Sequence, residues 1–249
     1  MAARRRLDAE LVRRGLAVSR AEAASAVEAG LVTVAGAPAL KSSRLVAADE
    51  PVALAGPPKR FVSRGGEKLD AALADFDIDV TGWRALDAGA STGGFTDCLL
   101  QRGAATVVTV DVGHHQLHER LRADPRVVVH EGVNVRHADP VALGAPFDLV
   151  VADLSFISLR TVASTLIGLL GDHGTLVWLV KPQFEAGRVE VAKGRGVVRD
   201  AAVRDRVRDE IHEHLASLGA DVRGWMDSPL PGPAGNVELL VHATVKDGG

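Results

Sequence analysis

The sequence predicts an α/β protein with a doubly wound, mostly parallel sheet, preceded by a small α+β domain. Three observations predict it. Apolar strands such as Thr106 to Val110 and Phe147 to Ala152 alternate with amphipathic helices from residue 63 onward. A glycine-rich turn over residues 87–96 joins a buried strand to a helix, as in sheets of this type. The last strand, 236–245, follows a proline-rich turn, and we expect it to form an antiparallel edge.

The composition is that of a folded protein, and the length allows one full α/β domain and a second, smaller domain. Apolar residues make up 47% of the 249 residues and charged residues 24%. No run approaches the roughly 18 to 20 apolar residues of a membrane span, and the basic N-terminus lacks the apolar stretch of a secretory signal. The single cysteine, Cys98, excludes an internal disulfide and is expected to be buried and inert. A cytoplasmic protein is predicted.

Charge is distributed unevenly along the chain. Residues 1–60 carry ten lysines and arginines against six acids, whereas the remainder has a balance of −7. We expect the basic part to contact a polyanion.

Residues 1–55 predict two helices followed by short strands. Leu7, Leu11 and Val12 share one face of a helix expected over 4–16. Ser19 and Glu22 then form a capping box that opens a second helix, which ends at Gly30. A hairpin over 31–36 follows, and residues 41–54 add one or two strands.

This unit resembles the S4-type RNA-binding domain. The resemblance rests on the Arg6-Leu7-Asp8 start, the Ser19-Arg20 pair and the hairpin pattern Gly30-x-Val32-x-Val34-x-Gly36. It implies binding to structured RNA, mainly through the RNA backbone. The residues implied in this contact are Arg4, Arg6, Arg20 and Lys41. The alternative is that these side chains form an ordinary solvated face.

Residues 56–62 are expected to be a linker, because Gly56-Pro57-Pro58 is stiff. The second domain then spans 63–249. Its first helix is amphipathic, and by pattern Lys68 is a solvated lysine near the start of that helix.

The turn at 84–96, RALDAGASTGGFT, predicts a nucleoside-bearing ligand. Its glycines let a ligand approach the backbone. Asp111 closes the next strand about twenty residues past the turn, where an acid can bind both hydroxyls of a ribose. Asp87 at the mouth of the turn would repel a pyrophosphate but could accept an amino group, which favours S-adenosylmethionine over NAD. A turn that only closes a strand–helix corner would not explain the acidic partner.

Charged residues also close later strands. Asp153 follows one apolar strand and Lys181 another, at the end of a parallel sheet where such folds bind ligands. Glu238 stands near the start of the final strand. Asn134 lies in a loop where adenine contacts are expected, and residues 185–200 predict a mobile lid over substrate.

A histidine cluster raises the question of a metal. His114 and His118 could share a helical face, but no acid or cysteine at ligand spacing completes a site. We therefore expect a solvated helix after Asp111 and no metal.

The second domain resembles the FtsJ-type RNA 2′-O-methyltransferase domain, through the segments DAGASTGGFT, ADLSFIS, VKPQFE and GNVEL. This resemblance implies a Rossmann-like class I methyltransferase fold, a mostly parallel seven-stranded sheet with helices on both faces. With the N-terminal unit, the whole chain resembles the TlyA family, which also carries the label haemolysin. Membership implies methyl transfer from S-adenosylmethionine to the 2′-hydroxyl of cytidine in ribosomal RNA. The arginine-rich N-terminus resembles members that modify both ribosomal subunits.

The same resemblance implies roles for individual residues. The catalytic tetrad would be Lys68, Asp153, Lys181 and Glu238. The cofactor would be held by Asp87, Gly89, Ala90, Ser91, Thr92, Gly93, Gly94, Phe95, Thr96, Asp111, Val112 and Asn134. We expect Lys181 to face the 2′-oxygen, the two carboxylates to orient the lysines, and Lys68 to tune Lys181 and hold substrate.

Three other functions remain open at this point. A small-molecule O-methyltransferase would share the turn and Asp111 but would not need a basic RNA module. A non-catalytic ribosome-assembly factor would keep the fold, although the complete tetrad argues against it. A haemolysin acting as a pore would need a membrane span or a long amphipathic stretch, and the sequence has neither.

Overall fold

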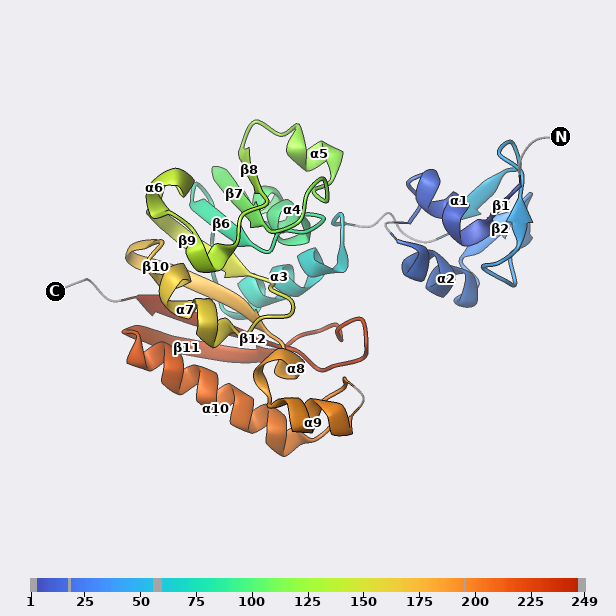
Figure 1. Ribbon diagram of the computed structural model, residues 1–249. Helices are drawn as coiled ribbons and strands as arrows, with labels where there is room; N and C mark the ends of the chain where they lie inside the picture. The colour runs from blue at the N-terminus through green and yellow to red at the C-terminus, as the bar shows by residue number, and fades with distance from the viewer. Residues whose placement is uncertain (1–3, 18, 56–59, 195, 246–249) are drawn as a thin grey trace. The chain divides into compact units, whose positions relative to one another are not determined.

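The computed structural model describes residues 4–17, 19–55, 60–194 and 196–245 (Figure 1). The chain divides into two compact units, Met1–Lys59 and Arg60–Gly249. Of the expected linker 56–62, residues 56–59 lie outside the described residues, and the other three belong to the second unit.

The described residues of the first unit form two helices, a three-stranded sheet and a two-stranded ladder. Its elements are β1 (Arg5–Arg6), α1 (Leu7–Arg13), α2 (Arg20–Glu28), β2 (Val32–Val34), β3 (Ala37–Pro38), β4 (Leu45–Val46) and β5 (Val52–Leu54). The sheet has the order β3-β2-β5, and the predicted hairpin is confirmed as β2–β3. The Ser19 hydroxyl accepts the backbone N–H of Glu22 at 3.2 Å, as the capping box predicts. The first helix begins at Leu7 rather than residue 4, because Arg5 and Arg6 pair with β4.

Some arginines of this unit are structural rather than exposed. Glu10 is fully buried, and its carboxylate accepts hydrogen bonds from Arg13 and Arg14. Arg14 also donates to the carbonyls of Ala47, Ala48 and Glu50. Arg14 is therefore a structural residue, 19% exposed, that fixes α1 to the 47–50 loop.

The second unit is the predicted doubly wound domain. Its elements are α3 (Arg64–Asp75), β6 (Arg84–Ala88), α4 (Gly94–Gln101), β7 (Thr106–Asp111), α5 (Glu119–Arg122), β8 (Val127–Glu131), η1 (Val135–His137), α6 (Pro140–Leu143), β9 (Phe147–Ala152), α7 (Leu159–Ile167), β10 (Leu170–Val180), α8 (Pro182–Glu185), α9 (Arg188–Lys193), α10 (Ala201–Ser217), β11 (Ala220–Asp227) and β12 (Leu239–Val245). The seven strands have the order β11-β12-β10-β9-β6-β7-β8, so the predicted seven-stranded, mostly parallel sheet is confirmed.

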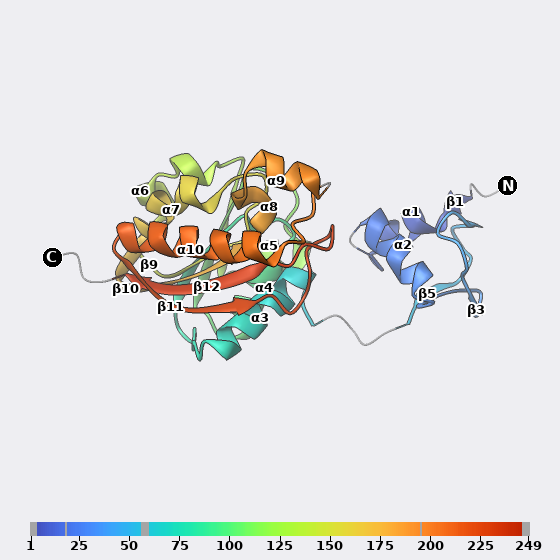
Figure 2. The ribbon, with the colours of Figure 1, turned by 90° about the horizontal axis from the view of Figure 1, so that it is seen from below.

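Helices cover both faces of this sheet because its central strands are apolar on both sides. Leu159, Val162 and Leu166 of α7 pack on one face together with α10. Leu69 and Leu73 of α3 pack on the other face together with α4. Figure 2 shows α10 and α3 on opposite sides of the sheet.

Two local expectations are wrong, and a third segment contains a helix that was not expected. The final strand β12 is antiparallel but lies one strand in from the edge, because β11 pairs along its outer side. No helix spans His114 to His118 in the described chain; His118 is instead the N-cap of the short helix α5. The expected lid at 185–200 contains the helix α9, and Val198 within it is 5% exposed.

The topology brings chemically active residues to one edge. Strands β6, β7, β9 and β10 run parallel and therefore end on the same side, while β12 runs antiparallel and begins there. Val180 at the end of β10 is paired with Leu239 at the start of β12. The residues that follow β9 and β10, and the residue that precedes β12, must all lie at this edge.

Candidate active site

The first charged pair of the site joins two strand ends. The ammonium of Lys181, after β10, lies 2.6 Å from Asp153 Oδ1, after β9. Lys181 also donates a 3.0 Å hydrogen bond to the hydroxyl of Ser155. Asp153 Oδ1 has no aligned hydrogen-bond donor among the described residues, so its contact with Lys181 is an ion pair rather than a directed hydrogen bond. The Asp153 side chain is 27% exposed, which leaves this pair open on one side.

The second pair joins a helix to the last strand. Lys68 of α3 donates a 2.5 Å hydrogen bond to Glu238 Oε2, and the two side chains are 7% and 1% exposed. A Cβ added to Gly232 would overlap Glu238 Oε1, so the loop before β12 closes tightly on this carboxylate. The helix pattern alone predicted a solvated Lys68, and that expectation is wrong. The resemblance placed it with the tetrad, and the structure pairs it with Glu238.

The glycine turn contains a buried acid with a free oxygen. Asp87 at the end of β6 is fully buried, and its Oδ2 accepts the hydroxyl of Thr96 at 2.6 Å. Its Oδ1 is buried and has no partner among the residues described. Burial, with a further contribution from the charge of Asp153, raises the pKa of Asp87 to about 7, against the opposing bond from Thr96. The orphaned oxygen is positioned to accept a hydrogen bond from a ligand or water.

The rest of the turn is held around Asp111. One carboxylate oxygen of Asp111 accepts the backbone N–H of Ser91 at 2.8 Å, and the other accepts that of Gly113 at 2.7 Å. Gly89 has a φ of +84°, and a Cβ there would overlap the carbonyl oxygen of Asp153. The turn therefore approaches the strand end that bears Asp153, and glycine is required for that approach.

Later residues of the turn serve the packing of α4. Phe95 is 3% exposed and belongs to the same core cluster as Leu69 and Leu73 of α3, so its side chain is used in packing. A Cβ on Gly94 would overlap Ser63 before α3, and one on Gly93 would overlap Leu117 and Leu121. The glycines at 93 and 94 therefore allow close packing against Ser63, Leu117 and Leu121, and they offer only backbone groups to a ligand.

The remaining predicted cofactor residues lie at the ends of β7 and β8. Val112 is 67% exposed. Asn134 is exposed, and its side-chain oxygen accepts the backbone N–H of Arg136 at 3.0 Å, which caps η1. Backbone bonds from Gly132 to Gly113 and from Val133 to Asp111 hold the two loops together.

Two of the four predicted RNA-binding residues of the first unit, Arg6 and Arg20, lie beside the same acid. Arg6 and Arg20 both pair with Asp8, at 2.9 and 3.1 Å, and their side chains remain 48% and 61% exposed. The Arg6 guanidinium, with a smaller contribution from Arg20, lowers the pKa of Asp8 to about 2. Lys41 is exposed on the loop whose Ser42 carbonyl accepts the N–H of Asp8. Arg4 is exposed just before β1.

Sequence reasoning missed three polar residues of the site: Ser155, Glu185 and Asn236. Ser155 bonds Lys181, and the buried Glu185 bonds the start of α7. Asn236 is 2% exposed and bonds the backbone of Gly196 and Val198 in the expected lid. The one sequence signal for these three residues is that each lies within four positions of a predicted tetrad residue.

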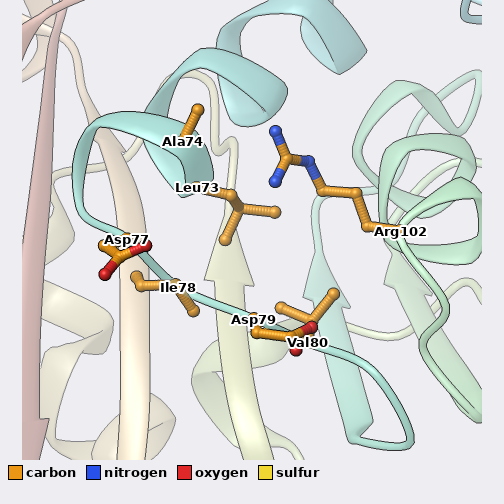
Figure 3. A pocket seen from close by; sticks show the side chains of 7 residues that line it. All are labelled: Leu73, Ala74, Asp77, Ile78, Asp79, Val80 and Arg102. Atoms are coloured by element: carbon orange, nitrogen blue, oxygen red, sulfur yellow. The ribbon is translucent and has the colours of Figure 1, made fainter.

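Other features lie apart from these charges. A hollow of about 260 Å³ opens at the far end of α3, lined by residues that include Leu73, Asp77 and Arg102 (Figure 3). It lies near the start of β6, at the opposite edge of the sheet from the tetrad. Cys98 is buried, which raises the pKa of its thiol to about 12, as expected for an inert thiol.

The described residues contain neither a metal-binding cluster nor a membrane-spanning helix. No three His, Cys, Asp or Glu side chains in residues 4–17, 19–55, 60–194 and 196–245 gather where they could hold a metal ion. Within the same ranges, none of the helices is both long and apolar enough to cross a bilayer.

The fold and the charged edge define a class I methyltransferase with an added RNA-binding domain. A model of the FtsJ-like methyltransferases, an S-adenosylmethionine-dependent family, matches residues 61–245, and a model of the S4 domain matches residues 5–52. The chain is 52% identical over 242 residues to the 16S/23S rRNA (cytidine-2′-O)-methyltransferase TlyA of Mycobacterium tuberculosis, covering 97% of this chain and 90% of that protein. The chain belongs to the TlyA family.

Two further similarities agree with this assignment. The 23S rRNA (cytidine-2′-O)-methyltransferase TlyA of Campylobacter jejuni is 33% identical over 182 residues, which are 73% of this chain and 70% of that protein. The solved structure of a hemolysin candidate from Streptococcus thermophilus is 39% identical with a TM-score of 0.81, covering 99% of this chain and 90% of that one.

Proposed function

We propose that this protein transfers a methyl group from S-adenosylmethionine to the 2′-hydroxyl of cytidine in ribosomal RNA of both subunits. The observation that carries the proposal is the pair of lysine–carboxylate contacts, Lys181–Asp153 and Lys68–Glu238, at the edge of the sheet that holds the glycine turn. A ribosomal substrate would place the enzyme in the cytoplasm.

The residues present fit the cofactor. Asp87 offers a buried, unpartnered oxygen suited to an amino group, and Asp111 stands at the strand end where a ribose is expected. Val112 and Asn134 are exposed on the loops where adenine is expected. S-adenosylmethionine, when bound, supplies a methyl group on a sulfonium, so the leaving group departs uncharged and needs no acid.

Lys181 is the residue we assign to the 2′-oxygen. A ribose hydroxyl is a very weak acid, so transfer needs a group that takes its proton or stabilises the developing charge. Asp153 and Ser155 hold the ammonium from one side, at 2.6 and 3.0 Å, while Asp153 stays partly open. Only Ser155 accepts a hydrogen bond from this ammonium among the described residues, so its other hydrogens, or the lone pair left after one is lost, are available to the substrate oxygen.

Lys68 and Glu238 form the fixed wall of the site. Their mutual burial holds α3 against the start of β12, next to the strand that ends in Lys181. Because each charge neutralises the other, neither residue is suited to take the proton. We therefore assign Lys68 and Glu238 the role of orienting the substrate. Positioning of the oxygen and methyl provides much of the rate in such transfers.

The first unit supplies RNA affinity in this proposal. Arg6 and Arg20 present two exposed guanidinium groups on one buried anchor, Asp8, which fixes them for phosphate contacts. Arg20→Glu is expected to weaken binding of ribosomal RNA at least severalfold and to reduce its salt dependence. Arg14→Gln is not a suitable control, because Arg14 is structural. Arg208→Glu on α10 is the matched change, because Arg208 is 47% exposed and lies 4.0 Å from its neighbour Asp209. Equal binding by Arg20→Glu and the unchanged protein would remove this role.

Two observations support action on both subunits. The 16S/23S enzyme resembles this chain at 52% identity over 97% of its length, whereas the 23S enzyme matches at 33% over 73%. The basic start of the first unit, which includes Arg4 and Arg6, is exposed.

The experiment that tests the proposal is methyl transfer from labelled S-adenosylmethionine to isolated small and large ribosomal subunits that lack the modification, followed by mapping of 2′-O-methyl sites. Label on a cytidine 2′-oxygen in both subunits is expected. Label on the large subunit alone would contradict the dual specificity. Bound cofactor without label on either would favour an assembly factor or a small-molecule enzyme.

A further inference from the structure

The Lys181–Asp153 pair is formed by two loops that follow neighbouring strands. Asp153 and Ser155 lie in the loop between β9 and α7, while Lys181 lies between β10 and α8. Their 2.6 and 3.0 Å contacts require this loop to hold one position relative to Lys181. Something other than the pair itself must fix that position, because an open ion pair contributes little rigidity.

Glu185, the last residue of α8, supplies this connection. Its Oε2 accepts the hydroxyl of Ser158 at 2.5 Å, and its Oε1 accepts the backbone N–H of Leu159 at 2.7 Å. Ser158 in turn caps α7 by accepting the N–H of Arg160. Both oxygens of Glu185 are thus used to hold the end of the loop that begins at Asp153.

The burial of Glu185 shows that this contact is costly to maintain. Its side chain is 2% exposed, and burial raises the pKa of the carboxyl against the opposing bonds from Ser158 and Leu159. Arg160 approaches only to 3.7 Å and instead donates to the Glu185 carbonyl. The carboxylate is therefore held by neutral donors from the loop and α7.

We propose that Glu185 is a positioning residue for methyl transfer, which fixes the loop bearing Asp153 and Ser155 against Lys181. It does not touch the reacting atoms. This inference rests on the proposed function, because the reaction it serves is the transfer assigned to Lys181.

The chain offers a matched control in Glu210 on α10. Glu210 also pairs with Arg160, at 2.9 Å, and its second ion pair is with Arg206 on its own helix, at 3.4 Å, so among the described residues its carboxylate does not hold Ser158 or Leu159. Glu210→Ala removes a carboxylate from the same arginine and leaves the loop bonds intact. A difference between the two alanine variants isolates the bonds to the loop from the general packing of α7 and α10.

The test compares Glu185→Ala, Glu185→Gln and Glu210→Ala in the full chain. Glu185→Ala is expected to lower the single-turnover rate on unmodified subunits by about ten- to a hundredfold, with dissociation constants for S-adenosylmethionine and RNA within twofold of the unchanged protein. Glu185→Gln is expected to recover most of the rate, because its amide can accept from Leu159 and donate to the Ser158 hydroxyl. Glu210→Ala should keep the unchanged rate.

A second readout does not depend on activity. Hydrogen exchange of the Leu159 amide in cofactor-free protein should quicken in Glu185→Ala and remain slow in Glu185→Gln. If Glu185→Ala does not fold, Ser158→Ala removes one of the two loop bonds and should lower the rate by a smaller factor.

Two results would overturn the inference: an unchanged rate in folded Glu185→Ala, or equal losses in Glu185→Ala and Glu210→Ala. A wild-type protein that methylates neither subunit would instead defeat the proposed function, and the exchange measurement would then still report whether Glu185 holds the loop.

Discussion

The two lysine–carboxylate pairs of the site are alike in chemistry and opposite in environment. Lys68 and Glu238 are 7% and 1% exposed, and they make a directed 2.5 Å hydrogen bond. Lys181 and Asp153 are 11% and 27% exposed, and their 2.6 Å contact is not aligned as a hydrogen bond. We call these the closed pair and the open pair.

The difference in exposure indicates that the two pairs have different roles. A closed pair pays a large desolvation penalty and is useful where geometry must not change. An open pair keeps access to substrate and can exchange one partner for another during a reaction. Only the open pair is therefore suited to handle the proton of the 2′-hydroxyl, and the following changes test that conclusion, beginning with the largest effect.

Loss of Lys181 tests the open pair directly. Lys181→Ala should lower the single-turnover methylation rate by about 10²- to 10⁴-fold, the usual effect of removing a general base, while RNA binding stays intact. Lys181→Arg keeps the cation but cannot give up its proton. An inactive Lys181→Arg variant supports a proton-accepting role, whereas substantial activity in that variant would mean that the cation alone suffices. Equal loss of RNA binding and methylation in Lys181→Ala would contradict the assigned role.

Loss of Lys68 tests the closed pair through stability. Lys68→Ala leaves the carboxylate of Glu238 buried without its partner and should cost about 3–5 kcal/mol of unfolding free energy. Urea denaturation measures this. The double change Lys68→Met with Glu238→Gln removes both charges and should recover most of that stability, without recovering methylation. A stable Lys68→Ala protein would mean that the closed pair contributes no rigidity.

Asp87 links the open pair to cofactor binding through pH. Burial and the Asp153 charge raise its pKa to about 7, so the carboxyl is mostly protonated at pH 6 and ionised at pH 8. A bound amino group favours the ionised form, so the dissociation constant for S-adenosylmethionine should fall by about tenfold from pH 6 to pH 8. Calorimetric titration measures it. Asp87→Asn should bind S-adenosylmethionine more weakly, and its dissociation constant should change less between pH 6 and pH 8. Ionisation of the ligand itself affects both proteins equally, so the difference between the two pH dependences reports Asp87. Parallel pH dependences would exclude Asp87 as the cause.

Substitution of Asn236 should have the smallest effect on methylation, because Asn236 acts on the Lys68–Glu238 pair only through the loop before β12. Its amide bonds Gly196 and Val198, at 3.0 and 2.8 Å, and so connects the expected lid to the segment that carries Glu238. Asn236→Ala leaves a buried N–H unpaired and should lower the unfolding free energy by about 1–3 kcal/mol, with a severalfold rise in KM for RNA. Ser228→Ala in the same loop is the control. A change in kcat without a change in KM would show that this connection serves the chemistry instead.

Much of the fold could be predicted because local patterns and backbone chemistry agree. The apolar strands, the glycine turn before α4 and the cap at Ser19 each follow from residues close in sequence. The helix expected at His114–His118 did not form, and α9 within 185–200 was not predicted, since neither segment has a strong periodicity.

The charged groups of the site can be recognised in the amino-acid sequence: two lysines, two acids and a glycine turn, with three of the charges next to strand ends. How these charges pair depends on the fold. Lys68 and Glu238 are 170 positions apart, and Lys68 by pattern belonged to solvent. A charged side chain is buried only where a partner from another segment meets it, and that meeting depends on the packing of α3 against the sheet. The same physical reason explains why Glu185 and Asn236 could not be assigned before their partners were known.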